Sequence, residues 1–459
     1  MKTAQTAHPL LEKIFHLSEK NTSPKTEILA GTTTFLTCVY IVAVNPAILS
    51  AAGMDPRAVF WATALSSAIA CLWIGLWANF PFALAPAMGL NAYFAYYVVN
   101  TLGLSWQNAL ACVFISGTVF CFLSIFKVQQ KIVDAMPSCI KHSVGAGIGF
   151  FIAFTGFQQA GIIASSPDTL LTLGNLASPG ALLALFGIAL TAILIIKRVK
   201  GGILIGILTV TVLGIFFKDP VTGLAYTQLP SSLIALDNPV TALAPTFFKL
   251  SFKGMFTGEP VVILGVVFAI ISFLFVDLFD SIGVLLGVAS KAGLVDENGN
   301  VPGAGKALFV SAGGAAVGAL LGTNTVTIYG AESTTGIAEG GRTGLTACTT
   351  GVLFILTLLF SPVFLMIPSI ATAPALVMVG IFMIEPLCHM DLGDFSIALP
   401  VFLTVAFMPF SYNIAYGILF GMLGYTLGQV ASGKAKKITP TVWVLTFVFF
   451  AYLVLDIIL

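Results

Sequence analysis

Several acidic residues lie inside apolar segments, where a charged side chain is costly. Asp277 and Asp280 lie past the midpoint of the apolar stretch 261–290, and Glu332 lies within 326–341. A carboxylate at the centre of a bilayer costs about 2.5–3.5 kcal/mol on insertion scales, so such residues face the protein interior or a water-filled cavity. Carboxylates facing a cavity can accept N–H donors from a neutral ligand and can bind and release a proton. These residues predict a solute site within the membrane.

Other polar residues could complete such a site. Asp277 and Asp280 are three residues apart, so a helix places them on nearly the same face. The amide of Asn91 can both donate and accept hydrogen bonds, and Ser333 adds a hydroxyl next to Glu332. Aromatic residues are abundant nearby, and a flat heteroaromatic solute could stack on one of them.

Some residues have plainer explanations. Arg342 follows Glu339 by three residues, a spacing at which ion pairs form, so we expect Glu339 to pair with Arg342. The glycines of Gly145-Ala-Gly147-Ile-Gly149 follow no predicted strand, so close helix packing explains them better than nucleotide binding. The seven cysteines form no CxxC pair, so we expect neither a disulfide nor a metal site, and we predict no cofactor.

The composition is that of a membrane protein. Of the 459 residues 58% are hydrophobic and 8% are charged, against about 25% charged residues in soluble domains. The apolar residues form blocks near the length of about 20 residues that crosses a bilayer. We predict an all-α polytopic protein with about fourteen spans, at 28–52, 58–78, 81–99, 105–126, 138–163, 178–197, 201–217, 261–290, 304–322, 326–341, 343–362, 368–388, 394–410 and 412–432. The sequence leaves open whether 440–459 crosses the bilayer once more.

Basic residues alternate between the loops, as the positive-inside rule expects. They follow the even-numbered spans, at Lys127, Lys131, Lys141, Lys197, Arg198, Lys200, Lys291, Lys306, Arg342, Lys434, Lys436 and Lys437. The opposite loops at 100–104, 164–177 and 363–367 contain no Lys or Arg. This pattern predicts a cytoplasmic N-terminus in a bacterial inner membrane. The net charge of +1 gives no reason to expect nucleic acid as a partner.

Two spans are broken. Residues 81–99 and 323–341 each begin with a short extended piece and continue as a half-helix, and each is third in its set of seven spans. Broken spans in corresponding positions of two halves are typical of transporter binding sites. Because seven is odd, the second repeat enters the membrane from the opposite side, which predicts inverted repeats. Ala85 and Ala331 lie at the breaks, and we include them with Ser333 among the predicted substrate-binding residues.

Three other functions compete with a carrier of a neutral solute. An intramembrane aspartyl protease needs aspartates on two helices, and the only intramembrane aspartates lie in 261–290, so we predict no enzyme. An anion carrier of the same fold would favour a basic residue in the first turns of the half-helices, where none is present. A channel fits less well, because a midplane site between broken helices favours alternating access.

Three stretches of the sequence form distinct motifs, namely Ala85-Pro-Ala-Met-Gly-Leu-Asn-Ala-Tyr-Phe-Ala95, Phe279-Asp-Ser-Ile-Gly283 and Tyr329-Gly-Ala-Glu-Ser-Thr-Thr-Gly-Ile-Ala-Glu-Gly-Gly-Arg-Thr-Gly-Leu345. In these stretches the chain resembles the AzgA-like purine permeases, a branch of the nucleobase–ascorbate transporter group. The resemblance runs from about Thr26 to Lys437, and the third stretch is the most specific. One departure from the wider group is visible, since Asp280-Ser-Ile-Gly stands where relatives that carry uracil and xanthine typically have Glu-His.

The resemblance implies a function and site residues. It implies proton symport of adenine, guanine or hypoxanthine, with Asp280, Glu332 and Asn91 as the matching polar residues of the eighth, tenth and third spans. Among these purines we lean to hypoxanthine and guanine, because a carboxylate can accept their N1–H whereas adenine presents an acceptor at N1. Glu332 and Asp280 are the predicted proton-coupling residues, and which of them carries the proton stays open.

The resemblance also implies a core domain and a gate domain, with two chains joined through their gate domains as a homodimer. The predicted division is a tail at 1–25, the core at 26–126 and 259–362, and the gate at 127–258 and 363–459, the last part including the C-terminal apolar segment.

Overall fold

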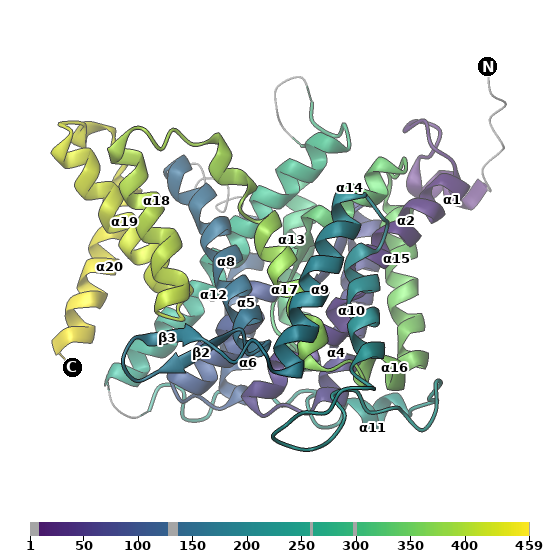
Figure 1. Ribbon diagram of the computed structural model, residues 1–459. Coiled ribbons are helices and arrows are strands. Elements are labelled where there is room, and N and C mark those ends of the chain that lie inside the picture. The colour runs from purple at the N-terminus through teal and green to yellow at the C-terminus, as the bar shows by residue number, and fades with distance from the viewer. Residues whose placement is uncertain (1–8, 127–135, 258–259, 297–300, 459) are drawn as a thin grey trace.

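The protein is almost entirely helical, as the apolar blocks predict (Figure 1). The computed structural model describes residues 9–126, 136–257, 260–296 and 301–458. Lys127, Lys131 and the predicted domain boundaries at 127 and 258–259 lie outside the described residues.

The helices and strands have these bounds. The α-helices are α1 Pro9–Phe15, α2 Pro24–Cys38, α3 Ile41–Leu49, α4 Pro56–Trp73, α5 Met88–Ala92, α6 Trp106–Ile125, α8 Ser138–Gln159, α9 Pro179–Ile196, α10 Gly202–Leu213, α11 Pro239–Leu243, α12 Pro260–Lys291, α13 Ala304–Leu321, α14 Gly330–Ala338, α15 Gly344–Thr357, α16 Ser361–Leu365, α17 Ser369–Phe382, α18 Phe395–Phe410, α19 Ile414–Ala431 and α20 Pro440–Ile458. The strands are β1 Ala83–Pro86, β2 Ile163–Ser166, β3 Leu170–Leu173 and β4 Val326–Tyr329. Shorter helical turns include η2 Ile74–Ala78, η3 Tyr93–Thr101 and η5 Glu385–His389.

The predicted spans correspond to these elements one by one. Among the described residues, ten helices are long and apolar enough to cross a membrane. The shorter apolar helices α10 and α18 and the two broken segments, β1–α5–η3 and β4–α14, account for the rest of the fourteen. The chain is therefore a multi-pass membrane protein with two inverted repeats of seven spans. Helix α20 follows and runs back beside α19 (Figure 1), with Thr426 and Thr446 hydrogen-bonded at 2.9 Å between them.

Local sequence explains where several spans begin. Ser23, Asp55 and Ser178 each precede a proline, and each side chain accepts a hydrogen bond from a backbone N–H in the first turn of the helix that follows. Proline suits the first helical position because its ring fixes φ and the N–H that it lacks would have no partner there. A cap followed by proline therefore starts α2, α4 and α9 at defined residues.

The helices pack in two groups. Helix α15 packs on α2 and α4, and α13 packs on α4 and α6. In the second group α17 and α18 pack on α8, α9 packs on α10 and α17, and α18 packs on α19. Figure 1 shows α18, α19 and α20 standing together at one end of the molecule. We call the first group the core group and the second the gate group, after the predicted domains. The division into core and gate domains stays a prediction.

The glycine-rich stretch of α8 lies at close helix contacts. A Cβ added at Gly149 would lie 2.7 Å from Gly380 O of α17, and one at Gly147 would lie 3.2 Å from Thr404 O of α18. At Gly149 a side chain would have to displace the backbone of α17, whereas nothing lies within 4 Å of a Cβ at Gly145. Two of the three glycines therefore serve helix packing, as the sequence predicts.

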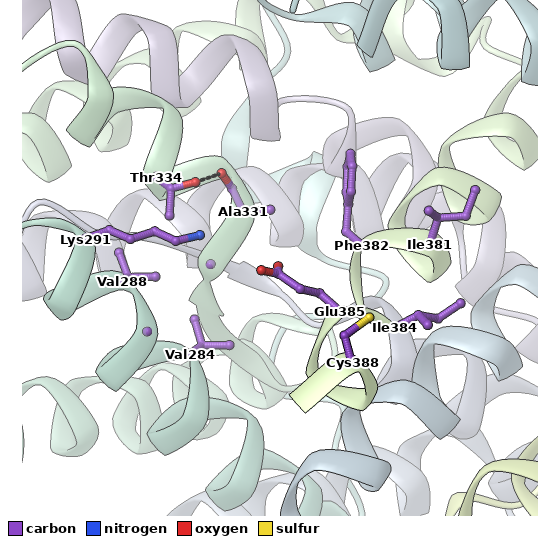
Figure 2. A pocket seen from close by; sticks show the side chains of 12 residues that line it. Val284, Val288, Lys291, Ala331, Thr334, Ile381, Phe382, Ile384, Glu385 and Cys388 are labelled. Carbon is purple, nitrogen blue, oxygen red and sulfur yellow. Dashed lines mark hydrogen bonds between the residues drawn. The ribbon is translucent and has the colours of Figure 1, made fainter. Parts of the chain in front are cut away.

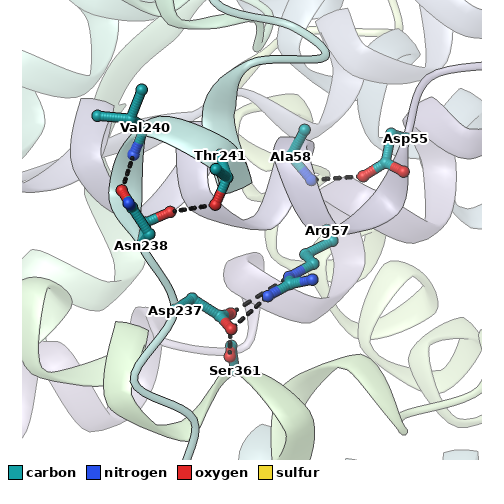
Figure 3. Close-up of polar contacts among 8 residues, drawn as sticks. All are labelled: Asp55, Arg57, Ala58, Asp237, Asn238, Val240, Thr241 and Ser361. Atoms are coloured by element: carbon teal, nitrogen blue, oxygen red, sulfur yellow. Dashed lines mark hydrogen bonds and ion pairs between the residues drawn. The ribbon is translucent and has the colours of Figure 1, made fainter.

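An ion pair fixes the segment before α11 to α4. The guanidinium of Arg57 donates to the carboxylate of Asp237, which also accepts from Ser361 Oγ at 3.2 Å (Figure 3). Further along, Phe248 N donates to Leu320 O at 2.8 Å. Part of the long connection between the repeats therefore lies against helices of the core.

Candidate functional site

The two broken spans meet and form the centre of the site. Strands β1 and β4 pair antiparallel, with Ala83 opposite Tyr329 and Ala85 opposite Thr327. Tyr329 Oη donates to Pro86 O at 2.7 Å and fixes the crossing. Because α5 follows β1 and α14 follows β4, both half-helices begin at the crossing. Their unpaired N–H groups and positive dipole ends therefore lie close together.

Glu332 lies in the first turn of α14, where the helix dipole stabilises a carboxylate. It lines the cavity beside the crossing and is 9% exposed. Its Oε1 accepts a hydrogen bond of 2.7 Å from Tyr40 Oη, at the interruption between α2 and α3. One oxygen of this carboxylate is therefore held by a hydroxyl from the first span.

The two aspartates of α12 have different surroundings. Asp280 is partly exposed, lines the same cavity as Glu332 and interacts with the hydroxyl of Thr327 on β4. Asp277 is 1% exposed, and its Oδ1 accepts from Ser281 Oγ, which is in turn 2.9 Å from Ser311 Oγ of α13. The sequence places both on nearly one helix face, and the packing of α13 against α12 separates them. Of the two aspartates, only Asp280 lines the cavity.

The cavity has a volume of about 490 Å³ and lies between the two helix groups. Its core side is formed by the start of α5, by α12 and by β4 with the start of α14. Its gate side is formed by α8 and α17, including Ile148, Ile152, Val379 and Phe382. A mostly apolar cavity with a few convergent polar groups is typical of a small-molecule site.

A second cavity of about 590 Å³ continues from the first. The two share Lys291, Ala331, Phe382 and Glu385 among their lining residues. Figure 2 shows Lys291 and Glu385 extending into this space from opposite sides, with Cys388 beside Glu385. The site is therefore reached through an opening between α12 and the end of α17.

The sequence-predicted site residues divide into two sets. Glu332, Asp280 and Ala331 line the cavity. Ala85 is fully buried in the paired strands, and Ser333 holds the crossing, since its Oγ accepts from Ala83 N at 3.0 Å and donates to Tyr329 O. These two residues are among those that support the cavity wall.

Asn91 is fully buried one turn into α5. Its Nδ2 donates to Asn45 Oδ1 at 3.0 Å, and Asn45 donates in turn to Thr63 and Thr323 at 2.7 Å each. Asn91 Oδ1 has no hydrogen-bond partner. The asparagine therefore joins the first, second and third spans to the start of the second broken segment.

Glu339 does not pair with Arg342, contrary to our expectation. Its carboxylate is 2.6 Å from Lys200 Nζ, in the turn between α9 and α10. Arg342 Nη1 instead donates to the carbonyls of Ile337 and Gly341 at 2.7 Å. Helix α14 ends at Ala338, so the i, i+3 geometry that the spacing assumed does not extend to Arg342.

Sequence reasoning missed Tyr40 and Thr327, the partners of the two cavity carboxylates. Tyr40 is separated from Glu332 by 292 residues, and a tyrosine in an apolar span carries no signal of its own. The extended stretch at 323–329 alone pointed toward Thr327, which lies opposite Ala85 in the strand pair.

The fold and the site define a membrane permease, because two half-helices and two carboxylates meet at a cavity between two helix groups. Residues 25–420 match the model of the Permease family. The chain belongs to this family, whose nucleobase branch is the one indicated by the three sequence stretches.

Named relatives match almost end to end. Guanine/hypoxanthine permease PbuG of Bacillus subtilis (strain 168) is 42% identical over 455 residues, which cover 97% of this chain and 99% of the relative. Adenine permease AdeP of Escherichia coli (strain K12) is 39% identical over 448 residues, which cover 97% of each. Among solved structures, the transmembrane domain of a cyanobacterium bicarbonate transporter, BicA, matches with a TM-score of 0.59 at 16% identity, covering 89% of this chain and 97% of that one. The last comparison concerns the fold.

Proposed function

We propose that this chain is a proton-coupled symporter that imports purine nucleobases, with hypoxanthine and guanine preferred. The observation that carries the proposal is that Glu332 and Asp280 line one cavity at the crossing of the two half-helices. Each carboxylate can accept an N–H, and each can exchange a proton with water that enters the cavity. The names of the relatives, which include guanine/hypoxanthine and adenine permeases, support a purine as the solute.

The two carboxylates take different roles in this proposal. Glu332 accepts the N1–H of an oxo-purine, because the start of α14 and Tyr40 fix its position. Asp280 carries the proton, since it lies on the long helix α12 beside the same cavity. The purine ring lies between Phe279 of α12 and the apolar side chains of α8 and α17. Asn91 acts indirectly in this proposal, by fixing the start of α5.

The alternative is an adenine-selective permease of the same family. AdeP is nearly as similar to this chain as PbuG is, so overall identity does not separate the two. Adenine presents an acceptor at N1 and would need a protonated Glu332. An anion as cargo is disfavoured because both central side chains are acidic, although Lys141 and Lys291 line the approach.

We propose an orientation in the membrane from the basic residues. Lys141 and Lys291 lie along the open cavity, and the positive-inside rule assigns them to the cytoplasm. In the proposed topology the N-terminus is cytoplasmic, the membrane is the bacterial inner membrane, and the structure faces inward. We also propose a homodimer joined through the gate domains, which native mass spectrometry of the purified protein tests directly.

Uptake assays test the transport function. In a bacterium that lacks purine uptake, expression of the chain is expected to give accumulation of radiolabelled hypoxanthine that a protonophore abolishes and sodium removal does not. Unlabelled guanine should compete, and uracil should compete poorly, because a pyrimidine leaves a buried polar group unpaired at a cost of about 1–3 kcal/mol. Uracil competing as well as guanine would refute the purine assignment, and sodium-dependent uptake would refute proton coupling.

A further inference from the structure

Tyr40 contacts the Glu332 carboxylate from the first span, which contributes no residue to the lining of the two described cavities. It lies where the first span is interrupted, between α2 and α3, and its side chain is 1% exposed. Its hydroxyl donates to Glu332 Oε1 at 2.7 Å. A buried tyrosine normally satisfies its hydroxyl with one partner, and here that partner is a carboxylate of the site.

The contact is part of a wider junction between the first span and the start of α14. One turn before Tyr40, Thr37 Oγ1 is 3.1 Å from Thr335 Oγ1 and 3.4 Å from Glu332 O. Helix α2 also packs closely on α14, since a Cβ at Gly336 would lie 2.6 Å from Ala30 O. The backbone of Glu332 is thus fixed by packing, while its side chain has Tyr40 Oη as a fixed anchor.

We propose that Tyr40 is a positioning residue that selects for an N–H donor on the purine, and this inference rests on the proposed function. By occupying Oε1, the hydroxyl holds the carboxyl group in one orientation and leaves Oε2 as the acceptor that faces the solute. Glutamate has three side-chain torsions, so without this anchor the carboxylate turns among several orientations in the cavity. Anchoring the carboxylate therefore raises the affinity only for a ligand that donates a hydrogen bond to Oε2.

The proposal predicts a selective defect in Tyr40→Phe. The substitution keeps the ring and its packing and removes one hydroxyl. We expect the KM for hypoxanthine uptake to rise about tenfold while Vmax stays within about twofold, as for the loss of one hydrogen bond to a charged group. Unsubstituted purine lacks the N1–H, so its inhibition constant should change little. The preference for hypoxanthine over purine should therefore fall about tenfold.

A matched control is Tyr226→Phe. The Tyr226 hydroxyl lies against Gly180 at the start of α9, away from the cavity. This variant should keep both the hypoxanthine KM and the preference over purine. Membrane abundance of each variant is measured by immunoblot, so that Vmax is compared per molecule of transporter.

The outcomes separate this inference from the proposed function. If the unaltered chain does not take up hypoxanthine, the proposed function fails. If it does, an unchanged KM in Tyr40→Phe overturns the positioning role. An equal loss of affinity for hypoxanthine and purine overturns it as well, because a general disturbance of packing would affect both solutes alike.

Discussion

At the scale of single residues, neighbouring side chains decide which carboxylates of the membrane spans line the cavity. Asp277 and Asp280 are three residues apart, yet Asp277 is enclosed with Ser281 and Ser311 while Asp280 lines the cavity. Glu332 combines a helix N-terminus, a tyrosine anchor and access to the same cavity. The proposed division of labour between Glu332 and Asp280 follows from these surroundings and can be tested by isosteric amides.

Glu332→Gln and Asp280→Asn should both abolish accumulation of hypoxanthine while reaching the membrane normally. Glu332→Gln should also bind hypoxanthine about tenfold to hundredfold more weakly, because hydrogen bonds to charged groups contribute about 1.5–3 kcal/mol. Asp280→Asn should keep most of its affinity. Isothermal titration calorimetry on the purified proteins measures the affinities, and uptake into cells measures accumulation.

Asp277→Asn is the matched control. It replaces a carboxylate by an amide on the same helix, at a residue that does not line the cavity. It should keep the affinity for hypoxanthine within about twofold. Normal transport by both Glu332→Gln and Asp280→Asn would contradict the assignment of the site. Because interacting carboxylates titrate as a pair, the loss of either one can also alter the proton binding of the other.

At the scale of elements, the site depends on two crossing strands that are too short to be stable alone. Each has four residues, and their pairing is supported by Ser333, by Tyr329 and by Asn324 Nδ2, which donates to Ala87 O at 3.0 Å. Around them, glycines let helices approach closely, so that the half-helices are held between rigid neighbours. In the gate group, glycines likewise allow the close contact between α8 and α17.

Gly149→Ala should destabilise the protein, because the added Cβ would lie 2.7 Å from Gly380 O. Overpacking of this kind costs about 1–3 kcal/mol. We expect a lower midpoint of thermal unfolding in detergent, measured by intrinsic fluorescence. Gly305→Ala in α13 is the control, since nothing lies within 4 Å of an added Cβ there, and its midpoint should not fall. Equal stability of both variants with the unaltered chain would show that α8 and α17 can separate without cost.

At the scale of the whole molecule, the proposed transport cycle requires the two helix groups to move relative to each other. The ion pair of Lys200 with Glu339 joins the turn between α9 and α10 to the end of α14, and so connects the two groups in the open-cavity state. An exposed ion pair contributes about 0.2–1 kcal/mol, which is enough to shift a balanced conformational equilibrium several-fold. The chain contains its own reporter of that equilibrium, because Cys388 is exposed in the outer cavity.

Lys200→Glu should lower the population of the open-cavity state by replacing attraction with repulsion. We expect Cys388 to react with a hydrophilic maleimide about two- to fivefold more slowly in the purified variant. The double variant Lys200→Glu with Glu339→Lys restores opposite charges and should recover the original rate. An unchanged rate in the single variant would mean that the pair does not bias the two states, and Cys388→Ser identifies the labelled residue.

The sequence by itself determined the class and the spans, and it predicted where the site lies. Apolar blocks of bilayer length form membrane helices, because lipid offers no hydrogen-bond partner for backbone N–H and C=O groups that are not paired within the protein. The two broken spans and the carboxylates within them were visible as departures from that rule, and they identified Glu332 and Asp280 as the side chains to examine. Ser/Asp–Pro caps likewise defined where several helices begin.

Only the tertiary structure decided which polar residues share the cavity. Asn91 and Ser333 are as polar as Glu332, but neighbouring spans enclose them, whereas Glu332 and Asp280 lie at the open boundary between the helix groups. The partners of Glu332 and Glu339 come from segments far away in the chain, Tyr40 and Lys200. Spacing along one helix reports only neighbours within a turn or two. Contacts between spans depend on how the two repeats interlock, and a single sequence contains no local signal for that arrangement.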